Sequence, residues 1–538
     1  MATDWLWWKH GVIYQIYPRS FYDSNGDGVG DLPGITQKLD YLSSLGVDAV
    51  WLSPINTSPM FDFGYDISDY RGIDPVFGTQ RDFDLFLAEA HRRGIRVIMD
   101  LVMNHTSHLH PWFIESRSSR DNPKRDWYIW RDGGKGRRYP NNWRAFFGGR
   151  AWEWDEKTRQ YYLHSFLKEQ PDVNWRNPHF REAMFGEIRY WLERGVDGFR
   201  LDVVNLFVKD DRFRNNPFAI GAYPRPYDLQ RHIYDRNCPE LHGILRDFRK
   251  LLDSYDERMS VGEVVVENDG NPALAVACLG PEGDELHLSF DFSFIHQKWS
   301  AAAFLKCIRN WEAAVPEKAW PCNVLNNHDQ PRSRSRHGGG TDAPARAKLM
   351  AAMLLTLRGT PFLYYGEEIG MSNGKIPRKE LQDPVGKRYW PFHPGRDPER
   401  TPMQWSAEPN AGFSTGRPWL PVNGDYTRVN VERQSGDASS VLKFYRRLIA
   451  LRRAYPALNR GNWEAVGDAR NDVLCYTRTH GAETLCVALN FAPSPRRIRP
   501  SLKGAWRVAL STHKSVSIEY PILDLGLAPY EATVMERV

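Results

Sequence analysis

Short, almost continuously apolar runs recur between residues 11 and 366, each followed by turn residues and then by a helical pattern. Apolar runs of this length are typical of parallel strands that are buried on both faces. Helical stretches such as 81–93 and 181–194 separate them. Eight β-then-α units favour a closed barrel over an open sheet, so we predict an α/β fold built on a (β/α)8 TIM barrel. The runs are 11–17, 49–54, 96–102, 198–204, 260–264, 286–292, 323–327 and 361–366.

Two regions depart from this repeat. Between the third and fourth runs, residues 105–170 are rich in Trp, Gly and Asn and are too long for a plain loop, so we predict an inserted domain after strand 3. After a helical stretch at 439–453, the pattern changes to alternating strands, which predicts a C-terminal antiparallel β-sandwich domain. The predicted boundaries are 1–104 and 171–458 for the two parts of the barrel, 105–170 for the inserted domain and 459–538 for the C-terminal domain.

Composition narrows the class of protein. The chain has 538 residues and a net charge of only +5, with acidic and basic residues mixed throughout. A nucleic-acid-binding face needs denser positive charge, so we expect no nucleic-acid partner. No run approaches 18 apolar residues, and the N-terminal residues lack the features of a signal peptide. We therefore expect no membrane span and a cytoplasmic location.

Charged residues sit at the ends of several predicted strands. The fourth run contains Arg200 and Asp202, the fifth contains Glu263, and the seventh leads into Asp329. An unpaired charge in a buried strand is strongly destabilising, and polar residues at the C-terminal ends of barrel strands face the active site. Any one of these carboxylates alone could be a structural ion pair. As a set, they predict a common site at one mouth of the barrel.

Several carboxylates around one pocket match the chemistry of glycoside hydrolysis, in which one attacks the anomeric carbon and another protonates the leaving oxygen. Arg200 lies two residues before Asp202 and so faces the same side of the strand. Its guanidinium would keep Asp202 ionised, as a nucleophile must be. Glu263 follows a glycine in a mostly apolar strand, a setting that raises a carboxyl pKa and suits the acid role.

These segments resemble the signature regions of the α-amylase family of glycoside hydrolases over almost the whole chain. The resemblance implies Asp202 as nucleophile, Glu263 as general acid/base and Asp329 as stabiliser of the transition state. It also implies Arg200, His105 and His328 as pocket partners. The four segments are Asp100-Leu-Val-Met-Asn-His105, Gly198-Phe-Arg-Leu-Asp202, Gly262-Glu263 and Asn327-His-Asp329.

Three further segments resemble the α-glucosidase and oligo-1,6-glucosidase group of that family: Gln170-Pro-Asp-Val-Asn174, Asp62-Phe-Gly-Tyr65-Asp66 and Arg396 to Trp405. By resemblance, Tyr65 stacks under the non-reducing glucose. Arg400 pairs with Asp62 and closes the pocket behind that glucose. Such a pocket implies an exo-acting enzyme that releases one glucose at a time.

Two aromatic residues of the inserted domain, Phe147 and Phe166, align with residues that wall the pocket in similar enzymes. The alternative is that they belong to the core of the inserted domain.

The sequence gives two opposing indications of linkage preference. In the group that this chain resembles, the residue after the nucleophile tends to be Val in α-1,6-acting enzymes, and here it is Val203. Against that, residues 382–391 resemble proteobacterial α-glucosidases that favour α-1,4 disaccharides and transfer glucose to acceptors. One residue at this subsite is worth ~1–3 kcal/mol of discrimination. We expect maltose-type substrates to be favoured, with α-1,6 activity left open.

The loop after the first strand has oxygen-bearing residues at alternate positions and glycines at the turns, the pattern of a hard-cation site. An EF-hand would need Glu at the position of Gly34 and a helix before the loop, and both requirements fail. The resemblance implies a structural Ca2+ or Mg2+ held by Asp23, Asn25, Asp27, the Val29 carbonyl and Asp31. The alternative is a turn without an ion. We expect no catalytic cofactor.

Two other functions stay open. One is a sucrose isomerase or transglucosylase of the same architecture. This alternative stays open because three basic residues follow Asp329, namely Arg332, Arg334 and Arg336. The other is a non-catalytic transporter-accessory protein, but proteins of that kind carry a membrane anchor and have lost catalytic carboxylates. The main expectation is a retaining α-glucosidase, a monomer or homodimer, acting on small α-glucosides such as maltose and transferring glucose to sugar or alcohol acceptors.

Overall fold

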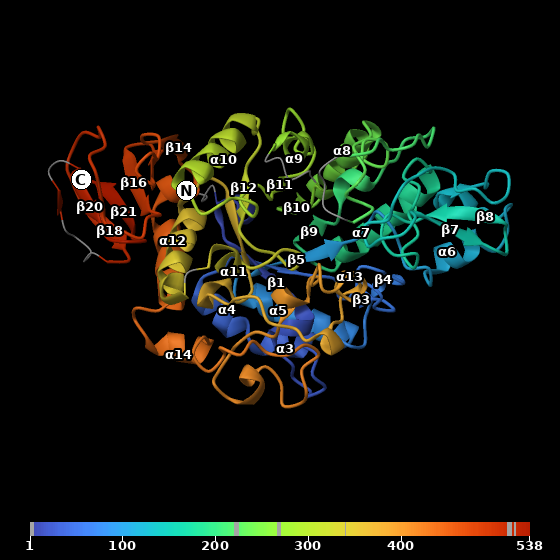
Figure 1. Ribbon diagram of the computed structural model, residues 1–538, viewed down its shortest axis with the longest axis horizontal. Coiled ribbons are helices and arrows are strands. Elements are labelled where there is room, and N and C mark those ends of the chain that lie inside the picture. The colour runs from blue at the N-terminus through green and yellow to red at the C-terminus, as the bar shows by residue number, and fades with distance from the viewer. Residues whose placement is uncertain (1–4, 220–224, 266–270, 339, 514–518, 521–522) are drawn as a thin grey trace.

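The computed structural model describes residues 5–219, 225–265, 271–338, 340–513, 519–520 and 523–538. Within them, eight parallel strands close into a barrel in the order β1-β13-β12-β11-β10-β9-β5-β2 (Figure 1). Each strand lies within or next to one predicted apolar run, so the predicted barrel is confirmed. The strands are β1 (Ile13–Ile16), β2 (Ala49–Leu52), β5 (Arg96–Leu101), β9 (Gly198–Leu201), β10 (Met259–Gly262), β11 (Leu288–Asp291), β12 (Cys322–Val324) and β13 (Thr360–Tyr364).

Successive strand residues face opposite sides of the barrel wall. Ile13, Trp51, Val261 and Phe362 belong to one buried cluster drawn from the strands, as expected for side chains that fill a barrel interior. Their strand neighbours, such as Tyr14, belong instead to the large cluster shared with the helices. Because both faces are buried, the strands read as continuous apolar runs. The surrounding helices include α3 (Leu32–Gln37), α4 (Leu39–Leu45), α5 (Gln80–Arg92), α7 (Pro178–Glu193), α8 (Glu240–Asp253), α10 (Ala301–Ala314), α12 (Ala343–Thr356) and α15 (Val441–Ala454).

Local sequence fixes where these helices begin. Helix α5 starts at a capping box, in which the Thr79 side chain accepts from the Asp82 backbone and the Asp82 side chain accepts from the Thr79 backbone. Helix α7 starts at Asn177, whose side chain accepts two backbone N–H groups, and has proline in its first turn. No helix among the described residues is both long and apolar enough to cross a bilayer.

The segment between β5 and α7 forms a small unit on one side of the barrel (Figure 1). It contains α6 (Pro111–Ser116) and a sheet of β6 (Trp130–Arg131), β8 (Gln160–Leu163) and β7 (Trp152–Asp155). Trp143, Trp152 and Leu163 form part of its own buried cluster. A bridge between His105 and Asp172 joins the two ends of the segment. The chain thus leaves and re-enters the barrel close to the predicted positions, while the bounds 105 and 170 stay predictions.

The C-terminal region forms an antiparallel sheet on the opposite side of the barrel from this insertion (Figure 1), as predicted. In its described part, a six-stranded sheet packs with a two-stranded ribbon, so one layer of the predicted sandwich is small. Val473, Val508 and Leu525 lie in the cluster between the two layers. The sheet order is β14 (Asn462–Ala465), β15 (Val473–His480), β16 (Glu483–Asn490), β21 (Ala532–Arg537), β18 (Trp506–Ser511) and β19 (Glu519–Tyr520), and the ribbon is β17 (Arg496–Ile498) with β20 (Leu525–Leu527).

Two buried arginines bind backbone carbonyl oxygens near the junction of this sheet with the barrel, and one of them, Arg478, joins the sheet to α12. Arg478 of β15 donates to the carbonyl oxygens of Thr356, at the end of α12, and of Gly461, at 2.5 and 2.9 Å. Arg452 of α15 donates to the carbonyl oxygens of Leu355 and Gly359 at 2.9 and 2.6 Å. Burial lowers the pKa of Arg452 to about 9 and that of Arg478 to about 10.

Candidate active site

Three neighbouring strands bring three carboxylates to one guanidinium at their C-terminal ends. Arg200 of β9 donates through Nη1 to Asp100 of β5 and to Asp202 just after β9, at 2.7 and 2.8 Å. Its Nη2 donates to Glu263, the residue after β10. The Arg200 side chain is 1% exposed, so these contacts lie in a low-dielectric setting. The predicted convergence of Arg200, Asp202 and Glu263 is therefore present, and Asp100 joins them.

One guanidinium cannot balance three carboxylates. Burial raises the pKa of Asp202, Arg200 lowers it, and the negative charges of Glu263, Asp100 and Asp329 raise it again, so the net pKa is well above the usual range. Burial likewise raises the pKa of Glu263, and that of Asp100 rises to about 6. The expected effect of Arg200 on Asp202 exists but is smaller than that of burial. The group therefore holds a proton near neutral pH, which suits the acid role of Glu263.

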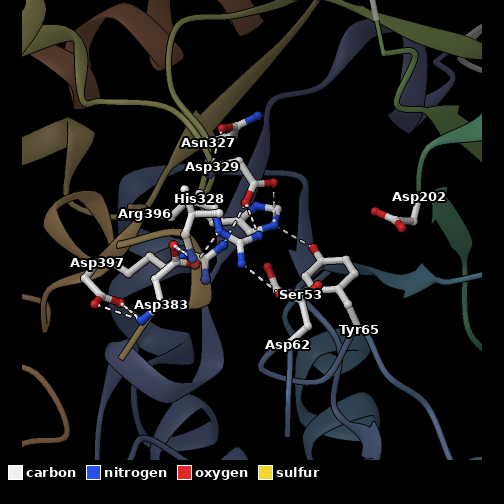
Figure 2. Close-up of polar contacts among 12 residues, drawn as sticks. Ser53, Asp62, Tyr65, Asp202, Asn327, His328, Asp329, Asp383, Arg396 and Asp397 are labelled. Carbon is white, nitrogen blue, oxygen red and sulfur yellow. Dashed lines mark hydrogen bonds and ion pairs between the residues drawn. The ribbon is translucent and has the colours of Figure 1, made fainter. Parts of the chain in front are cut away.

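Asp329 lies in a second charged group, shown in Figure 2. Its Oδ1 accepts from Arg400 Nη2 at 2.7 Å and from Arg396 Nη1 at 3.2 Å, and its Oδ2 lies 3.0 Å from His328 Nε2. Burial raises the pKa of Asp329, but His328 and the two guanidinium groups lower it more, and the net pKa is below the usual range. Asp329 is therefore held ionised, the state required of a group that stabilises a developing positive charge.

Tyr65 connects the two charged groups. Burial lowers the pKa of His328 well below its usual range, so the ring is neutral. Gln15 Nε2 lies 2.8 Å from His328 Nδ1 and can only donate, which assigns the ring proton to Nε2. That nitrogen lies 2.6 Å from the Tyr65 hydroxyl (Figure 2). The hydroxyl in turn donates to Asp100 at 3.1 Å. A hydrogen-bonded chain thus runs from His328 through Tyr65 to Asp100.

The predicted ion pair between Arg400 and Asp62 is wrong. Asp62 Oδ1 accepts from Arg396 Nη2 at 2.7 Å (Figure 2). Arg400 instead donates to Asp329 and to the His328 carbonyl oxygen, at 2.7 Å each. Arg396 precedes one turn of 3-10 helix, η6 (Asp397–Arg400), and Arg400 ends it, so the two side chains reach different partners. Sequence reasoning missed Arg396, although it stands at the start of the same motif.

His105 and Asp62 share a neighbour, Gln170. The Gln170 amide nitrogen lies 3.1 Å from Asp62 Oδ2 and 3.1 Å from His105 Nε2. The His105 ring packs against Phe166, with a centroid separation of 5.2 Å. Burial lowers the pKa of His105 to about 4, so the ring is neutral. His105 therefore contacts Phe166 directly and is linked to Asp62 through Gln170.

An apolar cluster lies beside the charged groups. Phe147 and Phe166 pack there with Val203, Leu206 and Val385, apart from the core cluster of the inserted segment. The Arg396 guanidinium lies 4.9 Å from the centroid of the Phe147 ring. This placement favours the pocket-wall interpretation of the two phenylalanines, and their contact with sugar stays a prediction.

Val203, directly after the nucleophile position, has a left-handed backbone with φ of 39°. Positive φ is a genuine outlier for a β-branched residue and costs about 1–3 kcal/mol. The backbone N–H of the next residue, Val204, donates to the Glu263 carbonyl at 2.8 Å. The strained turn therefore ties the end of β9 to the end of β10.

The loop predicted to bind a cation is held by its own hydrogen bonds. The side chains of Asp23, Asn25 and Asp27 each accept the backbone N–H two residues further on, at 3.0, 2.8 and 2.8 Å. Asp31 accepts from Gly34 and Ser24. The ligand atoms offered are hard oxygens, which fits Ca2+ or Mg2+. Within the described residues, however, no three His, Cys, Asp or Glu side chains already converge as a metal cluster.

The basic residues after Asp329 have structural partners. Arg332 is buried and donates to the Tyr365 carbonyl oxygen at 2.7 Å. Arg334 donates to the carbonyl oxygen of Gly370, and Arg336 to that of Leu325. These bonds support the loop that carries Asp329, so the arginine series gives no support to the isomerase alternative.

Comparisons with known proteins agree with this geometry. The catalytic domain of alpha amylase, as a protein family, matches residues 15–461. The chain is 46% identical over 503 residues to a probable alpha-glucosidase of Rhizobium meliloti (strain 1021), covering 91% of this chain and 90% of that protein. It is 42% identical over 562 residues to an oligo-1,6-glucosidase of Parageobacillus thermoglucosidasius, covering 98% of each.

A solved structure gives the same result. The alpha-glucosyl transfer enzyme XgtA superposes with a TM-score of 0.93 at 42% identity, covering 99% of this chain and 100% of that one. The extent of the family match, the closed barrel and the assembly of Asp202, Glu263 and Asp329 around one mouth lead to one conclusion: this chain belongs to the α-amylase family of glycoside hydrolases.

Proposed function

We propose that the protein is a retaining, exo-acting α-glucosidase that releases terminal α-glucose from short α-glucosides and also transfers it to hydroxyl acceptors. The observation that carries this proposal is the ion pair between Arg396 and Asp62, which lies next to the catalytic carboxylates. In this proposal, the ion pair lies at the far end of the glucose pocket and blocks the binding of a longer chain beyond the terminal glucose. The names of the relatives and of XgtA support the same activity.

In this proposal, Glu263 holds the proton and Asp202 is ionised: the Asp202 carboxylate attacks the anomeric carbon, and the bond from that carbon to the leaving oxygen breaks as Glu263 donates its proton to that oxygen. The product is a glucosyl ester of Asp202. Glu263, now ionised, then takes a proton from water or from an acceptor hydroxyl, whose oxygen attacks the same carbon and releases Asp202. Two displacements at one carbon retain its configuration. Asp329 stays ionised throughout and stabilises the positive charge that develops on the sugar ring.

The test is a panel of maltose, maltotriose, isomaltose and sucrose, with products followed over time and the anomer identified by NMR. We expect glucose to appear first as the α-anomer and maltotriose to lose one glucose at a time. Asp202→Asn and Glu263→Gln are each expected to abolish maltose hydrolysis while circular dichroism stays unchanged. β-glucose as first product would refute retention, and formation of sucrose isomers in place of glucose and fructose would favour the isomerase alternative.

The geometry of retention can also be tested directly. Retaining enzymes need about 5–5.5 Å between the two catalytic carboxyl groups. A crystal structure with glucose bound is expected to show this separation between Asp202 and Glu263. A separation in the range of inverting enzymes, about 6.5–9.5 Å, would overturn the mechanism.

For linkage, we propose a preference for maltose-type α-1,4 substrates with some α-1,6 activity. The support is the likeness of residues 382–391 to α-1,4-preferring enzymes, weighed against Val203. The same panel gives the ratio of kcat/KM for maltose and isomaltose, and a ratio below one would reverse the preference.

We further propose that the loop of Asp23, Asn25, Asp27, the Val29 carbonyl and Asp31 holds a structural Ca2+ or Mg2+. The hard oxygen ligands at alternate positions support it. Removing metal with EDTA should lower the thermal midpoint, adding Ca2+ back should restore it, and Asp27→Ala should lack both responses. An unchanged midpoint after metal removal would contradict the proposal.

We also propose a cytoplasmic location and a monomeric or dimeric state. Six cysteines without a regular disulfide framework support the location. Cell fractionation tests the location, and recovery in the periplasm would refute it. Light scattering after gel filtration tests the oligomeric state, and an assembly larger than a dimer would refute it.

A further inference from the structure

Arg396 joins three segments of the chain through three carboxylates, as Figure 2 shows. Its Nη2 donates to Asp62 at 2.7 Å, its Nη1 to Asp329 at 3.2 Å, and its Nε to Asp383 at 2.7 Å. Asp62 and Asp329 belong to the candidate sugar site. Asp383 does not, and neither the family resemblance nor the comparisons give it a role.

Asp383 is the most firmly held of the three carboxylates. Its side chain is fully buried, and its Oδ2 caps α13 (Pro384–Tyr389) by accepting the backbone N–H groups of Val385 and Gly386 at 3.0 and 3.1 Å. Its own backbone N–H donates to the Asp397 carboxylate at 3.0 Å (Figure 2). Both carboxylate oxygens and the backbone of Asp383 are thus fixed at once.

The returning chain packs directly on Asp383. Gly395 has φ of +75°, and a Cβ there would lie 2.5 Å from Asp383 Oδ2. Only glycine fits such an approach without moving the carboxylate. The capped helix and the glycine therefore leave Asp383 Oδ1 one position, facing Arg396 Nε.

A fixed partner at Nε determines the orientation of the whole guanidinium, because the five N–H groups of arginine lie in one plane. With Nε held by Asp383, Nη1 and Nη2 point to Asp329 and Asp62. Burial raises the pKa of Asp383, but Arg396 and Arg400 lower it more, so the carboxylate is ionised. Without this partner, the guanidinium could turn about its last side-chain bonds and loosen its bond to Asp62.

We propose that Asp383 is a positioning residue: it orients Arg396 so that the ion pair with Asp62 closes the glucose pocket. This inference rests on the proposed exo-glucosidase function and adds a residue outside the pocket that determines how tightly the pocket binds glucose. Asp329 keeps its bonds to Arg400 and His328 when Arg396 moves, so binding is affected more than the chemical step.

The test uses Asp383→Ser and Asp383→Asn. Both replacements keep an oxygen that can cap α13. Ser is too short to reach Arg396, and Asn lacks the charge. We expect the inhibition constant of free glucose and the KM for p-nitrophenyl α-glucoside to rise about 10–100-fold, which corresponds to the loss of one hydrogen bond to a charged group. The change in kcat should be smaller than the change in KM. Asp383→Glu, which keeps the charge, should lie closer to the wild type.

Two more variants make the result interpretable. Lys387→Ala changes an exposed residue on the same helix and should match the wild type. Arg396→Lys keeps the charge near Asp62 but has no Nε for Asp383, so it should reproduce the weaker glucose binding even if the Asp383 variants fold poorly. If folded Asp383→Ser and Asp383→Asn bind glucose as tightly as the wild type, the inference is refuted. A wild-type protein that releases no glucose from maltose would instead refute the proposed function.

Discussion

Replacing Arg200 by methionine tests the balance of charge at the nucleophile. Methionine fills a similar volume, and the substitution removes the cation that binds Asp100, Asp202 and Glu263. Removing one partner of a buried ion pair costs about 3–5 kcal/mol, because it leaves buried charge uncompensated. The carboxyls can avoid part of that cost by taking up protons, which makes the loss of stability depend on pH.

The direction of this dependence follows from the pKa values. Burial already raises the pKa of Asp100 to about 6 and that of Asp202 well above its usual range, and losing the guanidinium raises both further. A carboxyl whose folded-state pKa lies above its unfolded value favours folding at low pH and loses that contribution as the pH rises. The deficit of Arg200→Met relative to wild type should therefore be small at pH 5 and reach about 3–5 kcal/mol at pH 8.

Urea denaturation followed by tryptophan fluorescence at pH 5, 6, 7 and 8 measures this deficit. Activity should fall about 10²–10³-fold, and the acid limb of kcat/KM should move to higher pH because Asp202 keeps its proton longer. Arg194→Met is the matched control: Arg194 pairs with Asp84 at the surface, where the loss should stay below about 1 kcal/mol and not vary with pH. A deficit for Arg200→Met that is equal at pH 5 and pH 8 would refute the reasoning.

Three shorter predictions concern the neighbours of the nucleophile. Tyr65→Phe removes the hydroxyl between His328 and Asp100 and should lower kcat/KM for maltose about 5–30-fold, so unchanged kinetics would disprove the hydrogen-bonded chain. The negative charge of Asp329 raises the pKa of both Asp202 and Glu263. In Asp329→Asn, both limbs of the pH profile of the residual activity on an activated aryl glucoside should therefore move to lower pH, and a move to higher pH would contradict this. Val203→Thr should raise the maltose-to-isomaltose ratio of kcat/KM by about 10–200-fold at most, and a constant ratio would remove Val203 from linkage control.

Most of the fold could be predicted from the sequence because strands that are buried on both faces consist of continuous runs of apolar residues. The run at 96–102 became β5, and the run at 198–204 became β9 with the turn after it. The convergence of Arg200, Asp202 and Glu263 followed from the same logic, since equivalent ends of parallel strands meet at one mouth. These features depend on local pattern and topology alone.

The errors and omissions depend on side-chain geometry that no local pattern records. Two arginines four positions apart, Arg396 and Arg400, were equally good partners for Asp62, and the turn between them decided the outcome. The left-handed backbone of Val203 runs against the preference of a β-branched residue, so no propensity could predict it. Asp383 carried a helix-start signal, Asp before Pro, but nothing in the sequence linked it to Arg396.

The bond from Arg478 to the Thr356 carbonyl oxygen has a consequence for how this enzyme can be shortened. No described residue of the C-terminal sheet belongs to the candidate active site. Removing the sheet would nevertheless expose the end of α12 and take Arg478 away from the carbonyl oxygen of the buried Thr356. An isolated barrel would then expose the apolar surface of α12 and leave the carbonyl oxygen of Thr356 without its hydrogen bond from Arg478. The C-terminal sheet is therefore expected to stabilise the barrel, and a chain without it would need a changed α12 surface.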